Sequence, residues 1–505
     1  MTLQSILPSY VRGEWWTPST EEGAVEVVDA STGALVTRVS AAGLDLAGVL
    51  DYARTVGQAS LGELTFHQRA MVLKQLAQAL TARKDELYEL SSRAGATKTD
   101  SWIDIDGGIG VLFTYSSKGR RELPNTQVYV DGPAENLSKD GSFLGQHVYT
   151  RLPGVAVQIN AFNFPAWGFL EKFAPAFLAG MPTVVKPATP TGYVAEAAVR
   201  ILVDSGLLPA GSLQLVSGGV PDLFEHLRLG DLVAFTGSAS TAEKLRAHDS
   251  VQTGGVRFTG ETDSINASVL GADAVPGSPE FDAYVKQFVV ELRAKAGQKC
   301  TAIRRALVPV PLVDDVVAAV AALIDDRVVL GDPRADGVTM GPLASHAQRH
   351  EVLRQVLRLI DAGGELVIGS LDQPVVRHAD GSHGTAPEGA FIAPLVLRFA
   401  NAEAEAAHTV EAFGPVASIL GYTDTADAAR LVARGGGSLV TSVATHDTAI
   451  ARELVTRLAP YNGRVLVLDR DDARTSTGHG SPVPHLVHGG PGRAGGGEEL
   501  GGMRA

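Results

Sequence analysis

Short apolar runs alternate with amphipathic stretches through the middle of the chain. Runs rich in Val, Leu and Ile predict strands at 154–160, 182–187, 213–218 and 232–237. The stretches between and after them have apolar residues at helical spacing and predict helices at 166–180, 191–205, 222–230 and 240–248. Because strands and helices alternate, we expect an α/β domain with a parallel sheet and crossover helices.

A second block of the same kind follows, from about residue 258 to residue 469. It predicts helices near 281–296, 313–327, 347–361 and 447–458. It predicts strands near 304–310, 393–399, 416–422, 438–443 and 464–469. The stretch 126–150 alternates apolar residues around Gly and Asn and is typical of a protruding hairpin, whereas the last forty residues, rich in Gly, Pro and His, predict loop.

Composition places the chain among ordinary globular proteins. Its 505 residues are 45% hydrophobic and 20% charged, enough for two or three domains with large cores. A formal net charge of −13 argues against nucleic acid as the main partner. The N-terminus lacks the pattern of a signal peptide, and no apolar run is long enough to span a membrane, so we expect no membrane partner and a cytoplasmic location.

The chain has a single cysteine, Cys300, so it cannot form an intramolecular disulfide. This thiol follows Gly297-Gln298-Lys299 and precedes Thr301, with two arginines shortly after. Such a polar setting favours a reactive thiolate, which Lys299 would help to stabilise near neutral pH. A buried, inert thiol is the alternative interpretation.

Polar and glycine residues stand at the ends of the strands predicted in the first block. Asn160, Lys186, Gly218 and Gly237 each occupy such a position. Open α/β sheets bind ligands at the carboxyl edge, so the pattern predicts a nucleotide site there. No strict G-x-G-x-x-G is present, and ordinary βα turns are the alternative.

Eight segments occur in the order and spacing of the aldehyde dehydrogenase superfamily, which the chain resembles over its whole length. They are YVRGEWW, NAFNFPAW, VVKPATP, FTGS, FTGETDSIN, AGQKC, EAFGPV and HGGPGRAGGGEELGG. The resemblance implies an α/β aldehyde dehydrogenase fold with a Rossmann-like cofactor domain over 1–125 and 151–257 and an oligomerisation hairpin over 126–150. It implies an α/β catalytic domain over 258–480 and a C-terminal loop region over 481–505 that lacks the final oligomerisation strand of relatives. A homodimer or higher homo-oligomer follows from the same resemblance.

The wording of KAGQKCTAIRR, FTGETDSINASVLG and HGGPGRAGGGEELGG is similar to superfamily members of phenylacetate and benzoyl-CoA degradation, which act on aldehydes tethered to coenzyme A. It implies NADP-dependent oxidation of a CoA-linked semialdehyde to the free carboxylic acid, through a thiohemiacetal and a thioester on cysteine. A dehydrogenase of free aliphatic or aromatic aldehydes is the first alternative. A catalytically silent nucleotide-binding structural protein is the second.

The resemblance also implies catalytic roles by position. Cys300 matches the nucleophile, and the side-chain amide of Asn163 matches an oxyanion donor beside the backbone N–H of Cys300. Glu261 matches the base that activates water, which implies hydrolysis rather than transfer to free coenzyme A. The Leu-Gly-Gly usual after this glutamate is here Thr262-Asp263-Ser264. Glu499 matches a carboxylate assigned to proton relay; the alternatives are that Asn163 only forms a turn and that Glu499 is only solvated.

Cofactor contacts follow from the same matched positions. Lys186 matches the lysine that reaches the adenosine ribose, and Thr189 stands where many NAD-specific relatives carry a glutamate. A neutral residue there removes the charge that would repel a 2′-phosphate, so we expect NADP, with NAD bound more weakly. The other expected contacts are Gly218, Gly237, Ser238 at the pyrophosphate, and Glu411 and Phe413 at the nicotinamide ribose.

Three histidines near the C-terminus, His479, His485 and His488, fit no standard metal spacing, and we expect no metal. The segment GGPGRAGGGEELGG could be mistaken for a phosphate loop, but no predicted strand leads into it and no GK[ST] follows. We interpret it as a catalytic-domain loop over the substrate entrance.

Overall fold

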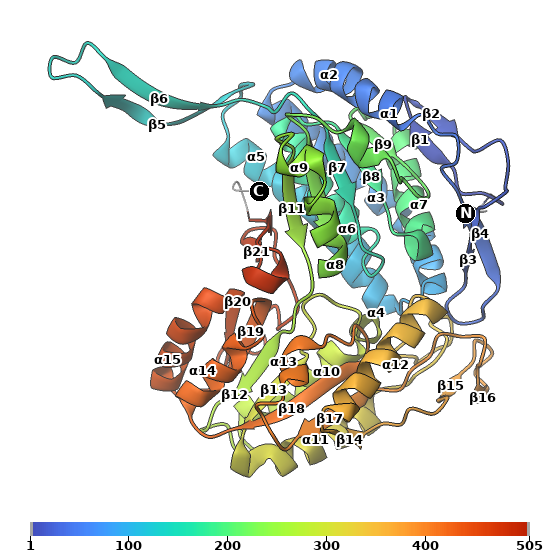
Figure 1. Cartoon of the computed structure of the whole chain (residues 1–505), viewed down its shortest axis with the longest axis vertical. Helices are drawn as coiled ribbons and strands as arrows, with labels where there is room; N and C mark the ends of the chain where they lie inside the picture. The colour runs from blue at the N-terminus through green and yellow to red at the C-terminus, as the bar shows by residue number, and fades with distance from the viewer. Residues whose placement is uncertain (1–3, 502–505) are drawn as a thin grey trace.

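Two seven-stranded sheets form the centres of two lobes, one coloured mainly blue to green and the other yellow to red (Figure 1). The computed structural model describes residues 4–501, apart from the side chains of Glu499 and Leu500. Helices flank both sheets, so the α/β class expected from the alternating pattern is confirmed.

The first sheet has the strand order β11-β10-β7-β8-β9-β1-β2. Its parallel strands are β7 (Ala156–Ile159), β8 (Thr183–Lys186), β9 (Leu213–Leu215), β10 (Leu232–Thr236) and β11 (Arg257–Glu261). The antiparallel strands β1 (Ser9–Val11) and β2 (Glu14–Trp16) complete one edge. Strands β7 to β10 are the four that the apolar runs predicted.

Both faces of the first sheet are buried. Val185 packs with one hydrophobic cluster and its neighbour Val184 with another, because successive side chains of a strand point to opposite faces. The cluster around Val185 includes residues of α3 (Phe66–Arg93), α5 (Gly107–Glu122), α6 (Trp167–Ala179) and α7 (Gly192–Asp204). The cluster around Val184 includes residues of α1 (Leu46–Tyr52) and α8 (Ala239–Arg246). The shorter helices of this lobe are α2 (Gln58–Gly62), α4 (Lys98–Ser101) and α9 (Asp249–Gln252).

The second sheet has the strand order β14-β17-β18-β13-β12-β19-β20. Its strands are β12 (Ala267–Leu270), β13 (Arg305–Pro309), β14 (Gly364–Ile368), β17 (Leu395–Phe399), β18 (Val416–Tyr422), β19 (Ser438–Ala444) and β20 (Asn462–Leu468). Only β14 runs antiparallel to its neighbour. The helices of this lobe are α10 (Pro279–Arg293), α11 (Val313–Arg327), α12 (His346–Asp361), α13 (Glu405–Thr409), α14 (Thr425–Ala433) and α15 (Thr448–Leu458).

Helix α10 shows how the sequence sets an element that carries the site. The Ser278 hydroxyl accepts the N–H of Phe281, and Pro279 takes the first helical position, where its missing N–H costs nothing. Phe281, Tyr284 and Phe288 recur at helical spacing and are buried in one cluster. The helix ends shortly before Cys300, so its packing fixes the loop that carries the thiol.

Two boundaries differ from the sequence predictions. The helix expected at 222–230 is only a 3₁₀ turn, Leu223–His226, because the Asp231 carboxylate accepts the N–H of Arg228 and stops the turn. Strand β11 pairs with β10 in the first sheet, so the catalytic block does not begin at 258, and the chain leaves the first sheet only after Glu261.

Four small hairpins lie outside the two large sheets in the described residues, three of them before the C-terminal region. The predicted one projects from the molecule as β5 (Tyr129–Asn136) and β6 (Leu144–Tyr149) (Figure 1). The others are β3 (Val25–Val28) with β4 (Leu35–Val39), and β15 (Val375–Arg377) with β16 (His383–Thr385).

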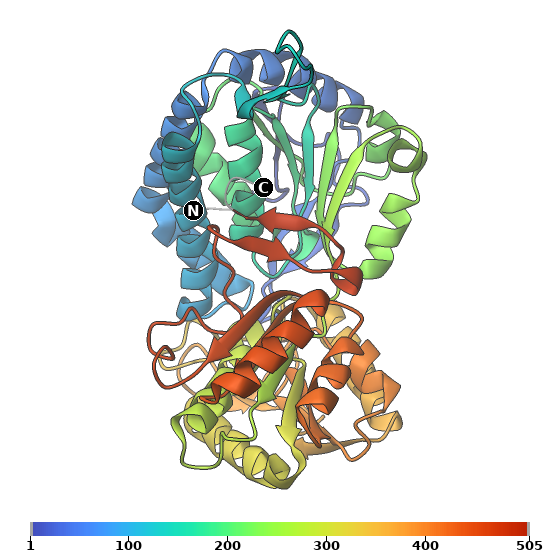
Figure 2. The same cartoon turned by 90° about the vertical axis from the view of Figure 1, so that its left-hand side faces the viewer.

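Over 481–501 the C-terminal region is not only the loop expected from the sequence, and the rest of the expected range, 502–505, lies outside the described residues. After β20 the chain returns to the first lobe and forms a hairpin of β21 (Val487–Gly489) and β22 (Glu498–Leu500), drawn in red (Figure 2). Strand β22 contacts α6 and β11. Pairing with β21 and contacts with segments far away in the sequence make a strand of a segment whose glycines alone predict loop. No helix in residues 4–501 has the length and apolar character needed to cross a membrane.

Candidate active site

Cys300 follows a turn with unusual backbone geometry. Lys295, Ala296 and Gly297 have φ values of 52°, 50° and 68°, in the left-handed region. Two of them are not glycine, and such residues cost about 1–3 kcal/mol each, which the surroundings must offset. The N–H of Lys295 donates to the Asp100 carboxylate at 2.8 Å. A Cβ on Gly297 would lie 2.1 Å from the carbonyl oxygen of Gly414, so glycine is required where the two loops touch.

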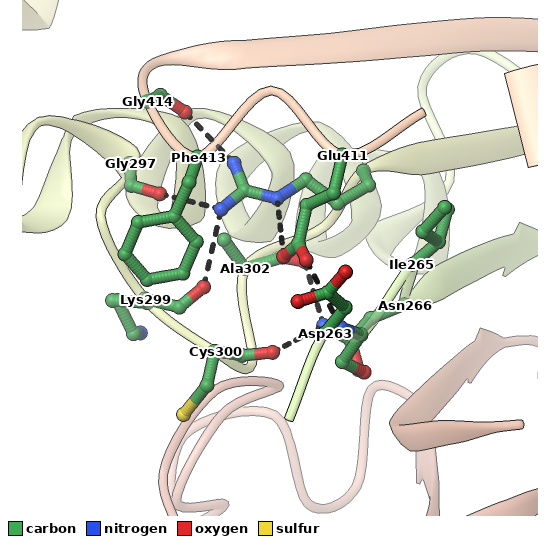
Figure 3. A network of polar contacts seen from close by, with 12 residues as sticks. Asp263, Ile265, Asn266, Gly297, Lys299, Cys300, Ala302, Glu411, Phe413 and Gly414 are labelled. Atoms are coloured by element: carbon green, nitrogen blue, oxygen red, sulfur yellow. Dashed lines mark hydrogen bonds and ion pairs between the residues drawn. The ribbon is translucent and has the colours of Figure 1, made fainter. Parts of the chain in front are cut away.

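Two buried side chains hold the backbone around Cys300 (Figure 3). The Arg304 guanidinium donates to the carbonyls of Gly414 at 2.8 Å and Gly297 at 2.9 Å. The side-chain amide of Asn266 donates to the carbonyls of Cys300 at 2.8 Å and Ala302 at 3.0 Å. Main-chain acceptors on both sides of the thiol are therefore fixed, and the nucleophile sits on a preorganised loop.

A carboxylate and an imidazole adjoin the thiol. The Cys300 sulfur, a Glu261 oxygen and a His488 ring nitrogen all lie within 4.8 Å of one another. Glu261 accepts a hydrogen bond from the thiol, and its Oε2 lies 2.9 Å from Nε2 of His488. This trio comes from β11, from the loop before β13 and from β21.

The electrostatics of the trio correct one expectation. Burial and the neighbouring Glu261 charge raise the pKa of Cys300 well above its usual value. Lys299 lowers this pKa, as expected, but by less than burial and Glu261 raise it, and it also forms a buried ion pair with Glu291 at 2.8 Å. The resting group is therefore a neutral thiol, and its ionisation needs a proton acceptor. Burial alone would raise the pKa of Glu261, but His488 lowers it to about 2, so the acceptor is ionised.

Asn163 also lies at this site. Its side-chain nitrogen donates to the carbonyl of Gln298 at 3.0 Å, two residues before the thiol. The start of α6, just after Asn163, is capped by Asp104, whose carboxylate accepts the N–H groups of Ala166 and Trp167 at 3.1 and 2.7 Å. Burial raises the pKa of Asp104 to about 6. Asn163 is thus tied to the nucleophile loop on one side and to a capped helix on the other.

A cavity of about 500 Å³ opens onto these groups. Asn163, Glu261, Cys300 and His488 line it together with Trp102, which is 61% exposed and so marks its outer rim. Residues 476–477 and 480–482 of the loop before β21 also line it. A small organic molecule with a reactive carbonyl fits this volume.

The expected cofactor residues lie at strand ends and on one neighbouring loop. Lys186 ends β8, Gly218 follows β9, and Ser238 accepts the N–H of Thr241 as the N-cap of α8. Thr189 begins a 3₁₀ turn after β8. Gly237 follows β10, and its N–H donates to the carbonyl of Glu261 at 3.2 Å.

Glu411 and Phe413 stand on the loop before β18. The Ser264 N–H donates to Glu411 at 3.1 Å, and Arg304 lies 3.7 Å from the same carboxylate (Figure 3). Burial raises the pKa of Glu411 to about 7 against the opposing effect of Arg304. The Phe413 ring packs edge-on against Phe162, with 5.9 Å between ring centres. Both residues therefore border the nucleophile loop.

Two residues at the carboxyl edge of the first sheet have buried polar groups without a hydrogen bond within residues 4–501. Among the described residues, nothing bonds the buried side-chain amide of Asn160 or the hydroxyl of Thr236. These residues lie at the ends of β7 and β10, and Thr236 also lines the cavity. Buried polar groups are rarely left unpaired, so their setting fits a bound polar ligand such as a dinucleotide.

The departure Thr262-Asp263-Ser264 does not loosen the loop after Glu261. Thr262 donates its N–H to the carbonyl of Ala494 and its hydroxyl to that of Arg493, at 3.1 and 2.5 Å. Asp263 accepts the N–H of Ala239 at the start of α8 at 2.9 Å. The hydrogen bonds of Thr262 and Asp263 thus hold the backbone of this loop, whereas two glycines would leave it more freedom.

The sequence analysis interpreted the glycine-rich segment as a loop over the substrate entrance. The structure places it elsewhere. A Cβ on Gly495 would meet the carbonyl oxygen of Gly260 at 2.2 Å, so the segment packs directly on the strand that ends in Glu261. A short strand, β21, does lead into it. Glu499 pairs with His488 across β21 and β22, and its side chain lies outside the described residues.

The three C-terminal histidines have different surroundings. His479 is buried, with Nδ1 2.8 Å from the hydroxyl of Ser442, and His485 is exposed. Only His488 joins Glu261 and Cys300, and sequence reasoning gave it no role except a rejected metal one. The one sequence feature that sets His488 apart is its place directly before a Gly-Gly pair, and this feature alone indicates no function. The absence of a metal stays a prediction.

Sequence reasoning also missed two buried charges of α6. Glu171 lines the cavity and accepts the indole N–H of Trp167 at 2.7 Å. Lys172 lies 3.1 Å from Glu171, and its charge helps to lower the pKa of Glu261.

Comparison with known proteins places this site in context. The model of the aldehyde dehydrogenase family matches residues 16–482. The chain is 42% identical over 487 residues to 3,4-dehydroadipyl-CoA semialdehyde dehydrogenase of Aromatoleum evansii, covering 96% of this chain and 93% of that one. It is 27% identical over 423 residues to mitochondrial succinate-semialdehyde dehydrogenase of Arabidopsis thaliana, covering 83% and 74%. A solved mutant of aldehyde dehydrogenase C from Pseudomonas syringae, complexed with NAD+ and octanal, has a TM-score of 0.81 at 22% identity, covering 98% and 94%.

Proposed function

The chain belongs to the aldehyde dehydrogenase family, and on that premise we propose that it oxidises a CoA-linked semialdehyde to the free carboxylic acid with NADP. The observation that carries the proposal is the thiol of Cys300, hydrogen-bonded to an ionised Glu261 on the wall of a cavity. The relative from Aromatoleum evansii supports the substrate class and a step in aerobic aromatic degradation.

Cys300 acts as the nucleophile in this proposal. Its thiol is neutral at rest, because burial and Glu261 raise its pKa. Glu261 takes the thiol proton while the sulfur bonds to the aldehyde carbon, so a free thiolate does not form in the buried site. The carbonyl oxygen gains the electron pair and becomes the oxyanion of a thiohemiacetal.

Asn163 and the backbone N–H of Cys300 stabilise that oxyanion. The Asn163 amide donates to the Gln298 carbonyl at 3.0 Å in the structure and can turn its second N–H toward the substrate. Donors fixed before the reaction are worth roughly 3 kcal/mol each, because they need no reorganisation when charge develops. A bound nicotinamide dinucleotide supplies the acceptor for the hydride that leaves the carbon.

The thioester left on Cys300 is resolved by water. Glu261 first releases the proton that it took from the thiol, which is the proton of the net reaction. It then accepts a proton from the water while the water oxygen bonds to the acyl carbon and the carbon–sulfur bond breaks. The departing thiolate then takes the proton from Glu261, which restores the thiol and releases the free acid. Aldehyde, oxidised cofactor and water thus give acid, reduced cofactor and one proton.

The residues at the carboxyl edge of the first sheet fit a dinucleotide. The unpaired Asn160 and Thr236 groups lie at this edge, and Ser238, the N-cap of α8, would contact the pyrophosphate. Lys186 and Thr189 would face the adenosine ribose, Gly218 and Gly237 would give the backbone close approach, and Glu411 and Phe413 would hold the nicotinamide ribose. Thr189 carries no charge to repel a 2′-phosphate, which favours NADP over NAD.

The remaining proposals concern the oligomeric state, the cellular location and Glu499. The β5–β6 hairpin projects into solvent with exposed Val130, Phe143 and Leu144, and we propose that it contacts a second copy in a homodimer or higher oligomer. A cytoplasmic location would keep Cys300 reduced. The proton-relay role of Glu499 also stays a proposal.

One assay tests the central proposal. The purified protein is offered 3,4-dehydroadipyl-CoA semialdehyde, the same aldehyde without its CoA moiety, and hexanal, each with NADP+ or NAD+, while absorbance at 340 nm is followed. We expect the highest kcat/KM for the CoA-linked aldehyde with NADP+, a free acid by mass spectrometry, and no acceleration by added coenzyme A. Equal efficiency with hexanal would favour a free-aldehyde dehydrogenase, and no turnover with any aldehyde would reject oxidation altogether.

A further inference from the structure

His488 lies against the reacting groups from the far end of the chain. Its Nε2 is 2.9 Å from Oε2 of Glu261, and the two side chains are only 6% and 4% exposed. The Cys300 sulfur lies within 4.8 Å of both groups. The imidazole therefore borders the reaction without being the nucleophile, an oxyanion donor or the base.

The backbone holds this pair in register. His488 is the middle residue of β21, and the segment after it packs on β11. The Thr262 N–H, directly after Glu261, donates to the carbonyl of Ala494 at 3.1 Å. Gly463 and Gly489 approach so closely that a Cβ on Gly463 would clash with the Gly489 carbonyl, which fixes β21 against β20. The contact between His488 and Glu261 is therefore built by tertiary structure on both sides.

We propose that His488 is a positioning residue that pairs with Glu261 and keeps this buried carboxylate ionised beside Cys300, an inference that rests on the proposed function. A carboxylate with almost no solvent contact would otherwise hold its proton at neutral pH and could not serve as a base. The positive charge of an imidazolium 2.9 Å away stabilises the carboxylate and so favours loss of its proton. A carboxylate has enough lone pairs to accept from the imidazolium and the thiol together.

The charges around the pair agree with this role. Glu261 and Glu171 raise the pKa of His488, while burial and Arg464 lower it, and the net direction is upward. His488 and Lys172 lower the pKa of Glu261 against burial. These charges therefore favour an imidazolium beside a carboxylate. The same charge makes Glu261 a weaker base, so the pairing helps most where the carboxylate would otherwise be protonated.

The protonation state can be measured without turnover. Histidine labelled with ¹³C in the ring gives one signal per residue in NMR spectra, and the His488 signal is identified by its loss in His488→Gln. We expect it to titrate above 6.5, the ordinary value for the imidazole, and to move to lower pH in Glu261→Gln, where burial is no longer opposed by the carboxylate charge. A titration below 6.5 in the unchanged protein, or one that Glu261→Gln does not move, would overturn the proposal.

The consequence for catalysis is a change in the pH profile. His488→Gln keeps an N–H donor but loses the charge, so the Glu261 carboxyl should titrate at higher pH. We expect kcat for aldehyde oxidation to fall roughly tenfold or more below pH 6 and to approach that of the unchanged protein near pH 9. An equal loss at every pH would show a structural role only and reject the proposal. His485→Gln, a change of an exposed histidine three residues away, is the matched control and should leave the profile unchanged.

Failure of this inference can be told from failure of the proposed function. If the unchanged protein oxidises no aldehyde, the proposed function fails, whereas the NMR titration still decides the charge of the pair. If the protein is active and both His488 readouts are negative, only the positioning role fails.

Discussion

The side-chain amide of Asn163 donates a hydrogen bond to the carbonyl of Gln298 at 3.0 Å, which ties the predicted oxyanion donor to the loop of the nucleophile. The amide therefore reaches the site from the loop between β7 and α6, while Cys300 reaches it from the loop before β13. Their relative position depends on the packing of the two lobes, and the variants below separate the roles of these groups.

Asn163→Ala should slow hydride transfer. The variant lacks the side-chain donor for the oxyanion, so the single-turnover rate of NADPH formation should fall roughly 10²- to 10³-fold, with NADP binding unchanged. Stopped-flow absorbance and fluorescence titration measure the two quantities. If the rate falls by less than threefold, Asn163 shapes the loop only.

Glu261→Gln should separate the two half-reactions. Gln keeps the shape but not the base, so deacylation should fall roughly 10²- to 10⁴-fold while hydride transfer continues. Because the thiol donates to Glu261, we expect a slower burst of full amplitude, up to one NADPH per active site. Intact mass should then show an acyl group on Cys300.

Cys300→Ala is the control for that experiment and should give neither burst nor adduct. A Glu261→Gln protein that also gives neither would show that adduct formation cannot proceed without Glu261, contrary to the slower burst expected here. Normal turnover in Glu261→Gln would show that another group, such as Glu499, is the base.

Thr189→Glu should reverse the cofactor preference. A carboxylate near the adenosine ribose would repel a 2′-phosphate, so the Kd for NADP should rise roughly fivefold or more while that for NAD stays unchanged or falls. Thr189→Gln has the same size without the charge and should change neither value by more than about twofold. Selectivity lies elsewhere if the ratio of the two affinities is unmoved by the glutamate.

Trp102→Ala should affect a CoA-linked substrate more than a free aldehyde. A CoA moiety is larger than the cavity of about 500 Å³ and must lie outside it, where Trp102 is 61% exposed at the rim. Loss of aromatic packing should raise KM for the CoA-linked aldehyde roughly 2- to 10-fold. The KM for hexanal, measured in parallel, should stay within about twofold, and an equal rise for both would contradict contact with the CoA moiety.

Acid should destabilise the second lobe through His408. Its Nδ1 accepts from the buried Arg305 and its Nε2 donates to the Ala402 carbonyl, both at 2.8 Å, which requires the neutral ring. Burial and the Arg305 charge lower its pKa to about 4 from 6.5. The stabilisation is thus fully present above pH 6.5 and is lost as pH falls toward 4.

The thermal midpoint of the unchanged protein should therefore fall between pH 6.5 and pH 4 more steeply than that of His408→Gln. The variant should be less stable at pH 7.5, where the neutral ring makes both contacts. If the thermal midpoints of the two proteins fall by the same amount over this pH range, His408 is not the cause of the loss of stability in acid.

Local sequence determined much of this protein. Apolar runs and helical spacing predicted β7 to β10 and helices such as α6, α7, α10, α11, α12 and α15, although not α3 or α5, because period and burial are local properties of a chain segment. The ordered segments resembling a known superfamily pointed to Cys300, Glu261 and Asn163, which the structure brings to one cavity. Their catalytic roles stay predictions.

Tertiary structure decided the ionisation states and the C-terminal end of the site. Lys299 is next to Cys300 in sequence and lowers the pKa of the thiol, yet the thiol is neutral because it is buried and Glu261 lies beside it. His488 stands more than two hundred residues after Glu261 and meets it only because the chain returns from the second lobe to the first. A pKa depends on burial and on neighbours in space, and neither is encoded in the spacing of residues along the chain.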